Sequence, residues 1–140
     1  MDWSIFSGLE SAYLVRILAC LAAGYIVGTE RELRHKVAGI STNSFVIAGA
    51  MSFAYFSLVL EPGNAGRIAA GIVTGIGFLG AGIILKGENG KISNLTTAAS
   101  IWFAAAIGMA IGFGWYLIAL FAVAFAIIVP RIPHVSGRRR

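Results

Sequence analysis

The sequence contains one stretch that could bind a nucleotide and one short run of ionisable residues. Gly75-Ile76-Gly77-Phe78-Leu79-Gly80 fits G-x-G-x-x-G, whose glycines let a backbone approach a pyrophosphate in dinucleotide-binding proteins. That chemistry needs a preceding strand, a following helix and an acidic residue about 20 positions further on. Here the pattern lies inside the apolar run 68–85, which has membrane-spanning length, so we do not expect a nucleotide site.

The ionisable run is Glu30-Arg31-Glu32, at the end of another apolar segment. Ionisable groups near the hydrocarbon boundary of a bilayer are costly unless paired, which makes them candidates for function. Glu30 could pair with Arg31 or Arg34, could lie at a helix N-terminus, or could contribute an oxygen ligand to Mg²⁺. A plainer interpretation is that these residues are the solvated ends of a topology signal.

The other residue types that could do chemistry form no recognisable site in the sequence. Cys20 is the single cysteine and lies in an apolar run, which is typical of a buried thiol. His35 and His134 have no cysteine or histidine at metal-ligand spacing. No nucleophile–base pair is visible. We therefore expect neither an enzyme nor a cofactor, with Mg²⁺ at Glu30 as the one metal to consider.

The composition places these residues in a membrane protein. Of the 140 residues, 58% are hydrophobic and 12% are charged, against about 25% charged in ordinary globular domains. The net charge of +5 forms no amphipathic stripe, so we expect the lipid bilayer as the surroundings and no nucleic-acid partner. The apolar runs predict one all-α transmembrane domain over residues 1–140, with five spans near 13–28, 43–60, 68–85, 98–113 and 116–129.

Lysine and arginine residues predict the orientation of the chain in the membrane. The segments after the first and third spans and the basic tail at 131–140 carry nine basic residues, and five spans place all nine on one side. The positive-inside rule then puts the N-terminus outside and the C-terminus in the cytoplasm. Gly112-Phe113-Gly114 is predicted to form the tight turn between the last two spans. Arg67 is the one basic residue in the outer loops, which suggests a specific partner for it.

Small residues recur along the predicted membrane helices. In lipid, such residues let helix backbones approach closely, and this packing drives helix association. We expect these glycines to pack helices within the chain or across a homo-oligomer, with a dimer favoured. A kinked or broken helix lining a cavity is the alternative for the third span. The packing candidates are Gly24, Gly28, Gly71, Gly75, Gly77, Gly80 and Gly82.

Two pairs of stretches in the chain match each other. Residues 16–24 and 67–75 both fit R-I-x-A-x-x-x-x-G, and residues 36–42 and 91–97 both fit K-[VI]-x-x-[IL]-[ST]-T. These matches predict a parallel repeat of two helical hairpins, each entering the membrane from the same side. The second pair places hydroxyl side chains just before the second and fourth spans, where they could cap the helices or line a shared vestibule. These residues are Ser41, Thr42, Thr96 and Thr97.

The combination of these motifs resembles the MgtC/SapB family over about residues 14–129. The matching pieces include Gly28-Thr29-Glu30-Arg31-Glu32, Ala38-Gly39-Ile40-Ser41-Thr42, GIGFLGAG from Gly75, and LTTAASIW from Leu95. The resemblance implies a multi-pass protein of the prokaryotic inner membrane, linked to growth at low magnesium and to survival inside macrophages. It also implies a regulator rather than a pump, and one member is associated with inhibition of the F-type ATP synthase.

The chain departs from the family pattern at a few positions. Asn94 stands where the family usually has glycine, and Gly71 stands where a polar residue is common. Many members also carry a soluble C-terminal domain, and functions that need that domain are not expected of these residues.

We expect a protein that regulates or binds other membrane proteins in magnesium and ion homeostasis, with an ATP synthase as one conceivable partner. The alternative is a small-cation transporter or channel formed by an oligomer, in which Glu30, Thr42, Arg67 and Thr97 would face a common cavity. The candidate functional residues are Glu30, Arg31, Thr42, Arg67, Asn94, Thr96 and Thr97.

Overall fold

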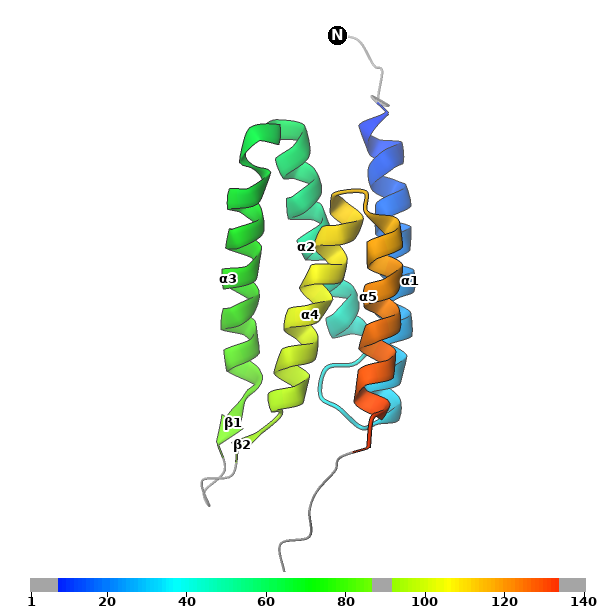
Figure 1. The fold of residues 1–140 in the computed structure, drawn as a ribbon, viewed down its shortest axis with the longest axis vertical. Helices are drawn as coiled ribbons and strands as arrows, with labels where there is room; N and C mark the ends of the chain where they lie inside the picture. Colours follow the sequence, from blue (N-terminus) through cyan, green and yellow to red (C-terminus); the bar gives the residue numbers. More distant parts are fainter. Residues whose placement is uncertain (1–7, 87–91, 134–140) are drawn as a thin grey trace, which may run out of the picture.

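The computed structural model describes residues 8–86 and 92–133 as a bundle of α-helices that run alternately up and down (Figure 1). The predicted all-α membrane fold is therefore confirmed. Lys91, His134 and most of the basic tail lie outside the described residues. The helices are α1 (Leu9–Leu33), α2 (Ile40–Leu60), α3 (Ala65–Ile83), α4 (Leu95–Gly112) and α5 (Tyr116–Ile128), with 3-10 turns η1 (Pro62–Asn64) and η2 (Val129–Arg131).

Four of the described helices are long and apolar enough to cross a membrane. These are α1, α2, α3 together with η1, and α4, with 25, 21, 22 and 18 residues. The fifth predicted span is also a helix, but α5 has only 13 residues. At about 1.5 Å per residue, α5 is about 20 Å long, which is shorter than a hydrocarbon core of about 30 Å.

The end of α3 differs from the predicted limit because the residues that follow it form a short pair of strands. The third span was expected to reach Leu85, but α3 ends at Ile83. Leu85 instead lies in strand β1 (Leu85–Lys86), which pairs antiparallel with β2 (Ile92–Ser93) and closes the connection to α4. The turn between α4 and α5 lies where it was expected. Gly114 has a φ of 79°, and its N–H donates to the carbonyl of Ile111 at 3.0 Å.

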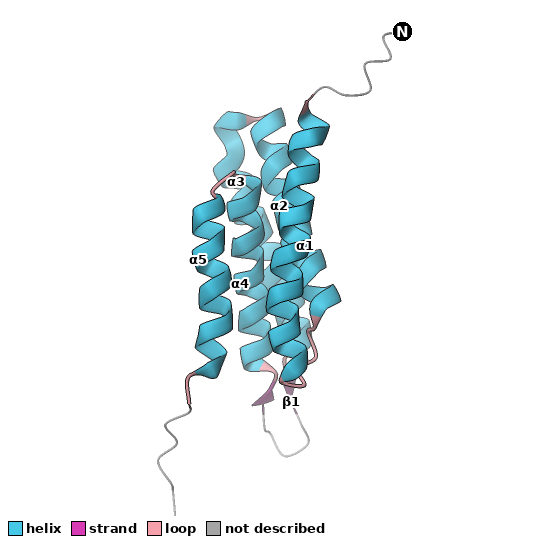
Figure 2. Cartoon of the chain, turned by 90° about the vertical axis from the view of Figure 1, so that its right-hand side faces the viewer, coloured by secondary structure: helices cyan, strands magenta, loops and turns pink. Residues whose placement is uncertain are grey.

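The core of the bundle lies between α2 and α4, which make the most extensive helix–helix contact. Ile47 and Met51 of α2 and Ile101 and Ile107 of α4 are fully buried there. Helices α1 and α5 lie on one side of this pair and α3 lies on the other (Figure 1). The view turned by 90° brings α1 and α5 to the front (Figure 2). In this arrangement α3 makes its main helix–helix contacts with α2 and α4.

The directions of the helices agree with the predicted repeat of two hairpins. Helices α1 and α3 run the same way, and α2 and α4 run the opposite way (Figure 1). The two hairpins are nevertheless packed differently. In the most apolar 18-residue stretch of each helix, 28% of α1 is buried against the bundle, but only 11% of α3 is buried. The hairpin of α3 and α4 therefore exposes one helix far more than the hairpin of α1 and α2 does.

Candidate functional site

The ionisable residues at the end of α1 form a buried cluster. Glu30 is 6% exposed and Arg31 is 1% exposed, and the carboxylate of Glu30 lies 3.7 Å from Nη1 of Arg31. One turn further along the helix, Nε of the more exposed Arg34 also pairs with Glu30. We call these three residues the ion-pair cluster. Among the possibilities that the sequence leaves open for Glu30, the structure contains the pairing with both arginines.

Several buried polar atoms near this end of the bundle have no hydrogen-bond partner among the described residues. They include Nε and Nη2 of Arg31 and Oδ1 of the fully buried Asn43, whereas the carboxylate oxygens of Glu30 face the two arginines of the ion pairs. An unsatisfied buried polar group costs about 1–3 kcal/mol, and buried ion pairs are weak evidence for stability. Stability alone therefore explains these residues poorly, and they remain the strongest candidates for a functional role.

The start of α2 is held by a side chain from α1 rather than by its own hydroxyl residues. Oε1 of Glu32 accepts a hydrogen bond from the N–H of Ile40 at 2.9 Å, which satisfies one of the free donors of the first turn. Ser41 and Thr42 were expected just before this helix, but α2 begins at Ile40 and they lie inside its first turn. The prediction that these two residues cap the helix is therefore wrong, because a tertiary contact from Glu32 takes that role.

The start of α4 shows a similar shift, with Asn94 as the residue that precedes the helix. Thr96 is exposed and Thr97 is 1% exposed, and both lie in the first turn rather than before it. Asn94 has a φ of 63°, a left-handed conformation that glycine adopts freely and asparagine tolerates. This conformation explains why asparagine suits a position where the resemblance expects glycine. Nδ2 of Asn94 also donates to the carbonyl of Ile83 at 3.3 Å, which joins α4 to the end of α3.

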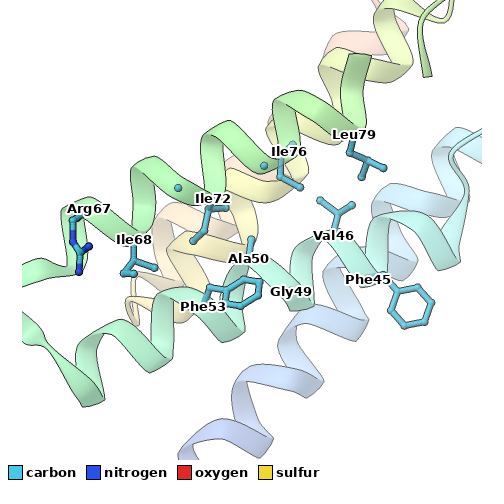
Figure 3. A pocket seen from close by; sticks show the side chains of 12 residues that line it. Phe45, Val46, Gly49, Ala50, Phe53, Arg67, Ile68, Ile72, Ile76 and Leu79 are labelled. Carbon is cyan, nitrogen blue, oxygen red and sulfur yellow. The ribbon is translucent and has the colours of Figure 1, made fainter. Parts of the chain in front are cut away.

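Arg67 lies near the start of α3, at the other end of the bundle from the ion-pair cluster (Figure 1). It pairs with Glu61 at 3.6 Å, and both side chains are exposed. Arg67 also stands at one end of an open groove of about 620 Å³ between α2 and α3 (Figure 3). We call this cavity the α2–α3 groove. The cation-path alternative placed Arg67 in one cavity with Glu30, Thr42 and Thr97, and none of those three residues lines the α2–α3 groove.

The candidate glycines fall into two groups by what surrounds them. A Cβ added at Gly24 would collide with Ser44, and one added at Gly28 would collide with the backbone of Ile40, so α1 and α2 approach closely there. A Cβ at Gly80 would lie 3.8 Å from Ala98 of α4. Around the other candidate glycines, all of which lie on α3, an added Cβ would meet nothing within 4 Å. These open positions are Gly71, Gly75, Gly77 and Gly82.

A further close approach, which the sequence analysis missed, lies between α2 and α4. An added Cβ at Gly108 would collide with the carbonyl oxygen of Ile47, and one at Gly112 would lie 2.6 Å from the carbonyl oxygen of Met51. Gly108 and Gly112 form a G-x-x-x-G pair, so the signal was present in the sequence.

Arg16 is a second residue whose role the sequence analysis missed. Its guanidinium lies 4.7 Å from the ring centre of Tyr55, within the range of a cation–π contact. Nε also donates to the carbonyl of Gly112 at 3.4 Å. Arg16 thus links α1 to α2 and to the end of α4.

The described residues contain no cluster of acidic, cysteine and histidine side chains of the kind that holds a metal ion. Across residues 8–86 and 92–133, no group of three or more histidine, cysteine, aspartate or glutamate side chains could hold a metal ion. Glu30, the carboxylate considered as a ligand, is paired with two guanidinium groups, whose positive charge repels a cation. The geometry at the end of α1 therefore fits internal charge neutralisation better than metal coordination.

Comparison with known proteins gives the family of the chain. The family model described as MgtC family matches residues 17–135. The chain is similar to Protein MgtC of Salmonella typhimurium strain LT2, with 44% identity over 110 residues that cover 79% of this chain and 47% of the relative. It is also similar to Protein MgtC of Brucella abortus strain 2308, with 45% identity over 121 residues that cover 83% of this chain and 50% of the relative.

The chain thus spans about half the length of the curated relatives that it matches. No solved structure matches it. The family match, the relatives and the all-α bundle agree with one another, and the chain belongs to the MgtC family.

Proposed function

We propose that this chain is a regulatory protein of the prokaryotic inner membrane that influences magnesium and ion homeostasis by binding other membrane proteins. Binding would take place between helices within the bilayer, first to a second copy of the chain and then to a larger complex, of which an ATP synthase is one candidate. The observation that carries the proposal is the exposure of α3, of whose most apolar stretch only 11% is buried.

The outer face of α3, on the side away from the α2–α3 groove, has the composition of a helix-docking surface. Helical spacing places Ala70, Thr74, Gly77 and Ala81 together on this face, and all four are exposed. The hydroxyl of Thr74 is bonded to the carbonyl of Ala70 at 3.0 Å, so the face carries no unsatisfied hydroxyl. Small residues of this kind let a second helix approach closely in lipid.

The pairing of the polar residues also supports a regulator over a transporter. A path for a small cation needs polar groups that face a common cavity. Here Glu30 is neutralised by the two arginines, and Arg67 lies at the other end of the bundle. These charges are therefore paired within the chain and do not face a common cavity, and α3 is left to make contacts outside it.

Site-specific photo-crosslinking in the native membrane would test the proposal. A photoreactive residue at Phe78, which is 85% exposed on α3, should give defined adducts with a second copy or a partner protein. The matched control is Phe121, which is 64% exposed on α5 and should give none. Equal adducts at both positions, or none at Phe78, would argue against docking on α3.

Magnesium flux into proteoliposomes gives the complementary measurement. Wild-type protein and Glu30→Gln should both fail to move Mg²⁺, because the proposal gives the chain no conduction path. A flux that wild type supports and Glu30→Gln abolishes would replace the regulator with the transporter alternative. Circular dichroism and protease protection would show that both proteins are folded and inserted.

A further inference from the structure

The α2–α3 groove combines an apolar floor with one pair of opposite charges at its end. From α2 it is lined by Val46, Ala50 and Phe53, and from α3 by Ile68, Ile72 and Ile76 (Figure 3). Gly71 and Gly75 also line it, and neither carries a side chain to fill it. Its volume of about 620 Å³ falls within the range of about 300–1,000 Å³ that is usual for small-molecule pockets.

We propose that the α2–α3 groove is a binding site for one phospholipid with a zwitterionic, amine-bearing headgroup. One acyl chain lies along the apolar floor, the headgroup phosphate contacts Arg67, and the headgroup ammonium contacts Glu61. This site is distinct from the outer face of α3 proposed above for protein contacts, so the two proposals can fail independently.

The length of the groove argues for an acyl chain rather than for a helix. The lining of α3 extends from Arg67 to Leu79, and at about 1.5 Å per residue these twelve steps measure about 18 Å. Half of a hydrocarbon core of about 30 Å is about 15 Å. The groove therefore matches the depth of one leaflet, with Arg67 at the headgroup level, whereas a transmembrane helix needs a surface that continues through both leaflets.

The charges at the mouth of the groove argue for a zwitterionic headgroup. Arg67 and Glu61 lie 3.6 Å apart, and Nδ2 of Asn64 donates to Oε2 of Glu61 at 2.8 Å, which holds the carboxylate in place. Both charged side chains are exposed, and such surface pairs contribute little to stability, so a ligand can bind between them at small cost. A phosphate next to an ammonium complements this pair, whereas a purely anionic headgroup would meet the negative charge of Glu61.

Native mass spectrometry of the delipidated full chain in detergent would test the apolar part of the site. With equal amounts of phosphatidylethanolamine and phosphatidylglycerol added, we expect wild type to retain phosphatidylethanolamine in preference. Gly75→Leu should lower its retention about tenfold, because Gly75 lines the groove and an added Cβ there meets no other atom within 4 Å, so the leucine side chain can occupy the space of the acyl chain. Gly82→Leu is the matched control, since Gly82 is equally open but does not line the groove, and its retention should stay at the wild-type level.

Variants of Arg67 and Glu61 test the proposed contacts with the lipid headgroup. Arg67→Gln should lower retention of phosphatidylethanolamine, and Glu61→Gln should remove the preference for it over phosphatidylglycerol. Arg131→Gln replaces an exposed arginine at the other end of the bundle and should change neither result. Equal retention of the two lipids by wild type would overturn the headgroup assignment.

Two outcomes would overturn the site itself. One is equal retention of lipid by Gly75→Leu and Gly82→Leu when circular dichroism shows that both are folded. The other is a wild-type dimer that Gly75→Leu converts to a monomer with no change in bound lipid, because the groove would then belong to a second copy of the chain.

Discussion

At the scale of single residues, the main feature is a charge that is almost completely removed from solvent. Arg31 is 1% exposed, and its acidic partner among the described residues is Glu30. Leaving one member of a buried pair without its partner costs far more than the pair contributes when both are present. The ion-pair cluster should therefore tolerate loss of the exposed Arg34 better than loss of Glu30.

Glu30→Gln should destabilise the protein by about 3–5 kcal/mol, because it leaves the charge of Arg31 buried and uncompensated. The matched control is Glu61→Gln, which breaks an exposed ion pair and should cost at most about 1 kcal/mol. Denaturant unfolding in detergent micelles, followed by circular dichroism, measures both. A similar decrease in the free energy of unfolding of the two variants would show that the burial of an ion pair does not determine how much its loss destabilises the protein.

The cap that Glu32 provides gives a second prediction for a single residue. Glu32→Ala removes the acceptor of the Ile40 N–H and should cost about 0.5–2 kcal/mol, the range for loss of a helix cap. Glu32→Gln should restore most of that stability, because the amide oxygen of glutamine can still accept the bond. Hydrogen exchange at the Ile40 amide should be faster in Glu32→Ala than in Glu32→Gln, and equal rates in the two would contradict the assignment.

At the scale of the elements, the sequence predicts where helices form better than how they meet. The apolar runs are long, so the positions of α1 to α4 follow from hydropathy alone. The spacing of small residues shows that they share a helix face but not which neighbour the face meets. Gly75 and Gly112 each belong to a G-x-x-x-G pair, yet the first is open and the second touches the backbone of α2. The residue that caps α2 was not predictable locally, because Glu32 reaches it from another helix.

Alanine substitution should have opposite effects at Gly112, which packs against α2, and at Gly82, which has open space around it. Gly112→Ala should cost about 1–3 kcal/mol, the range for overpacking, because its Cβ would lie 2.7 Å from that of Ala54. Gly82→Ala has open space around it and should be neutral or stabilise α3 by up to about 1 kcal/mol through helix propensity. Thermal unfolding of the two variants in one detergent makes the comparison, and equal shifts would contradict this packing.

At the scale of the whole molecule, the alternation of the helices and the distribution of lysine and arginine lead to one orientation. The N-terminal ends of α1 and α3 lie at the same end of the bundle (Figure 1). The positive-inside rule assigns that end to the outside. The short α5 is the element on which the side of the C-terminus depends, and a bilayer can thin locally to accommodate a helix of about 20 Å.

Cysteine labelling should confirm this orientation. In a Cys20→Ala background, Gly63→Cys in the exposed turn before α3 should react with a membrane-impermeant maleimide in intact cells. Lys36→Cys, which is also exposed but lies between α1 and α2, should react only after the cells are lysed. A reporter fused after residue 140 should be active in the cytoplasm if α5 crosses. The reverse labelling pattern would invert the assigned orientation.

The loose attachment of α3 has a consequence for how the bundle can open. Besides its contacts with α4 and α2, it is joined to the rest of the chain at its two ends, by Asn94 and the β1–β2 pair at one end and by η1 at the other. The free energy needed to open a segment rises with the contacts that it buries. Among the four described helices long enough to cross a membrane, α3 buries the smallest share of its most apolar stretch. We therefore expect α3 to separate from the bundle at a lower free energy than α1, α2 or α4.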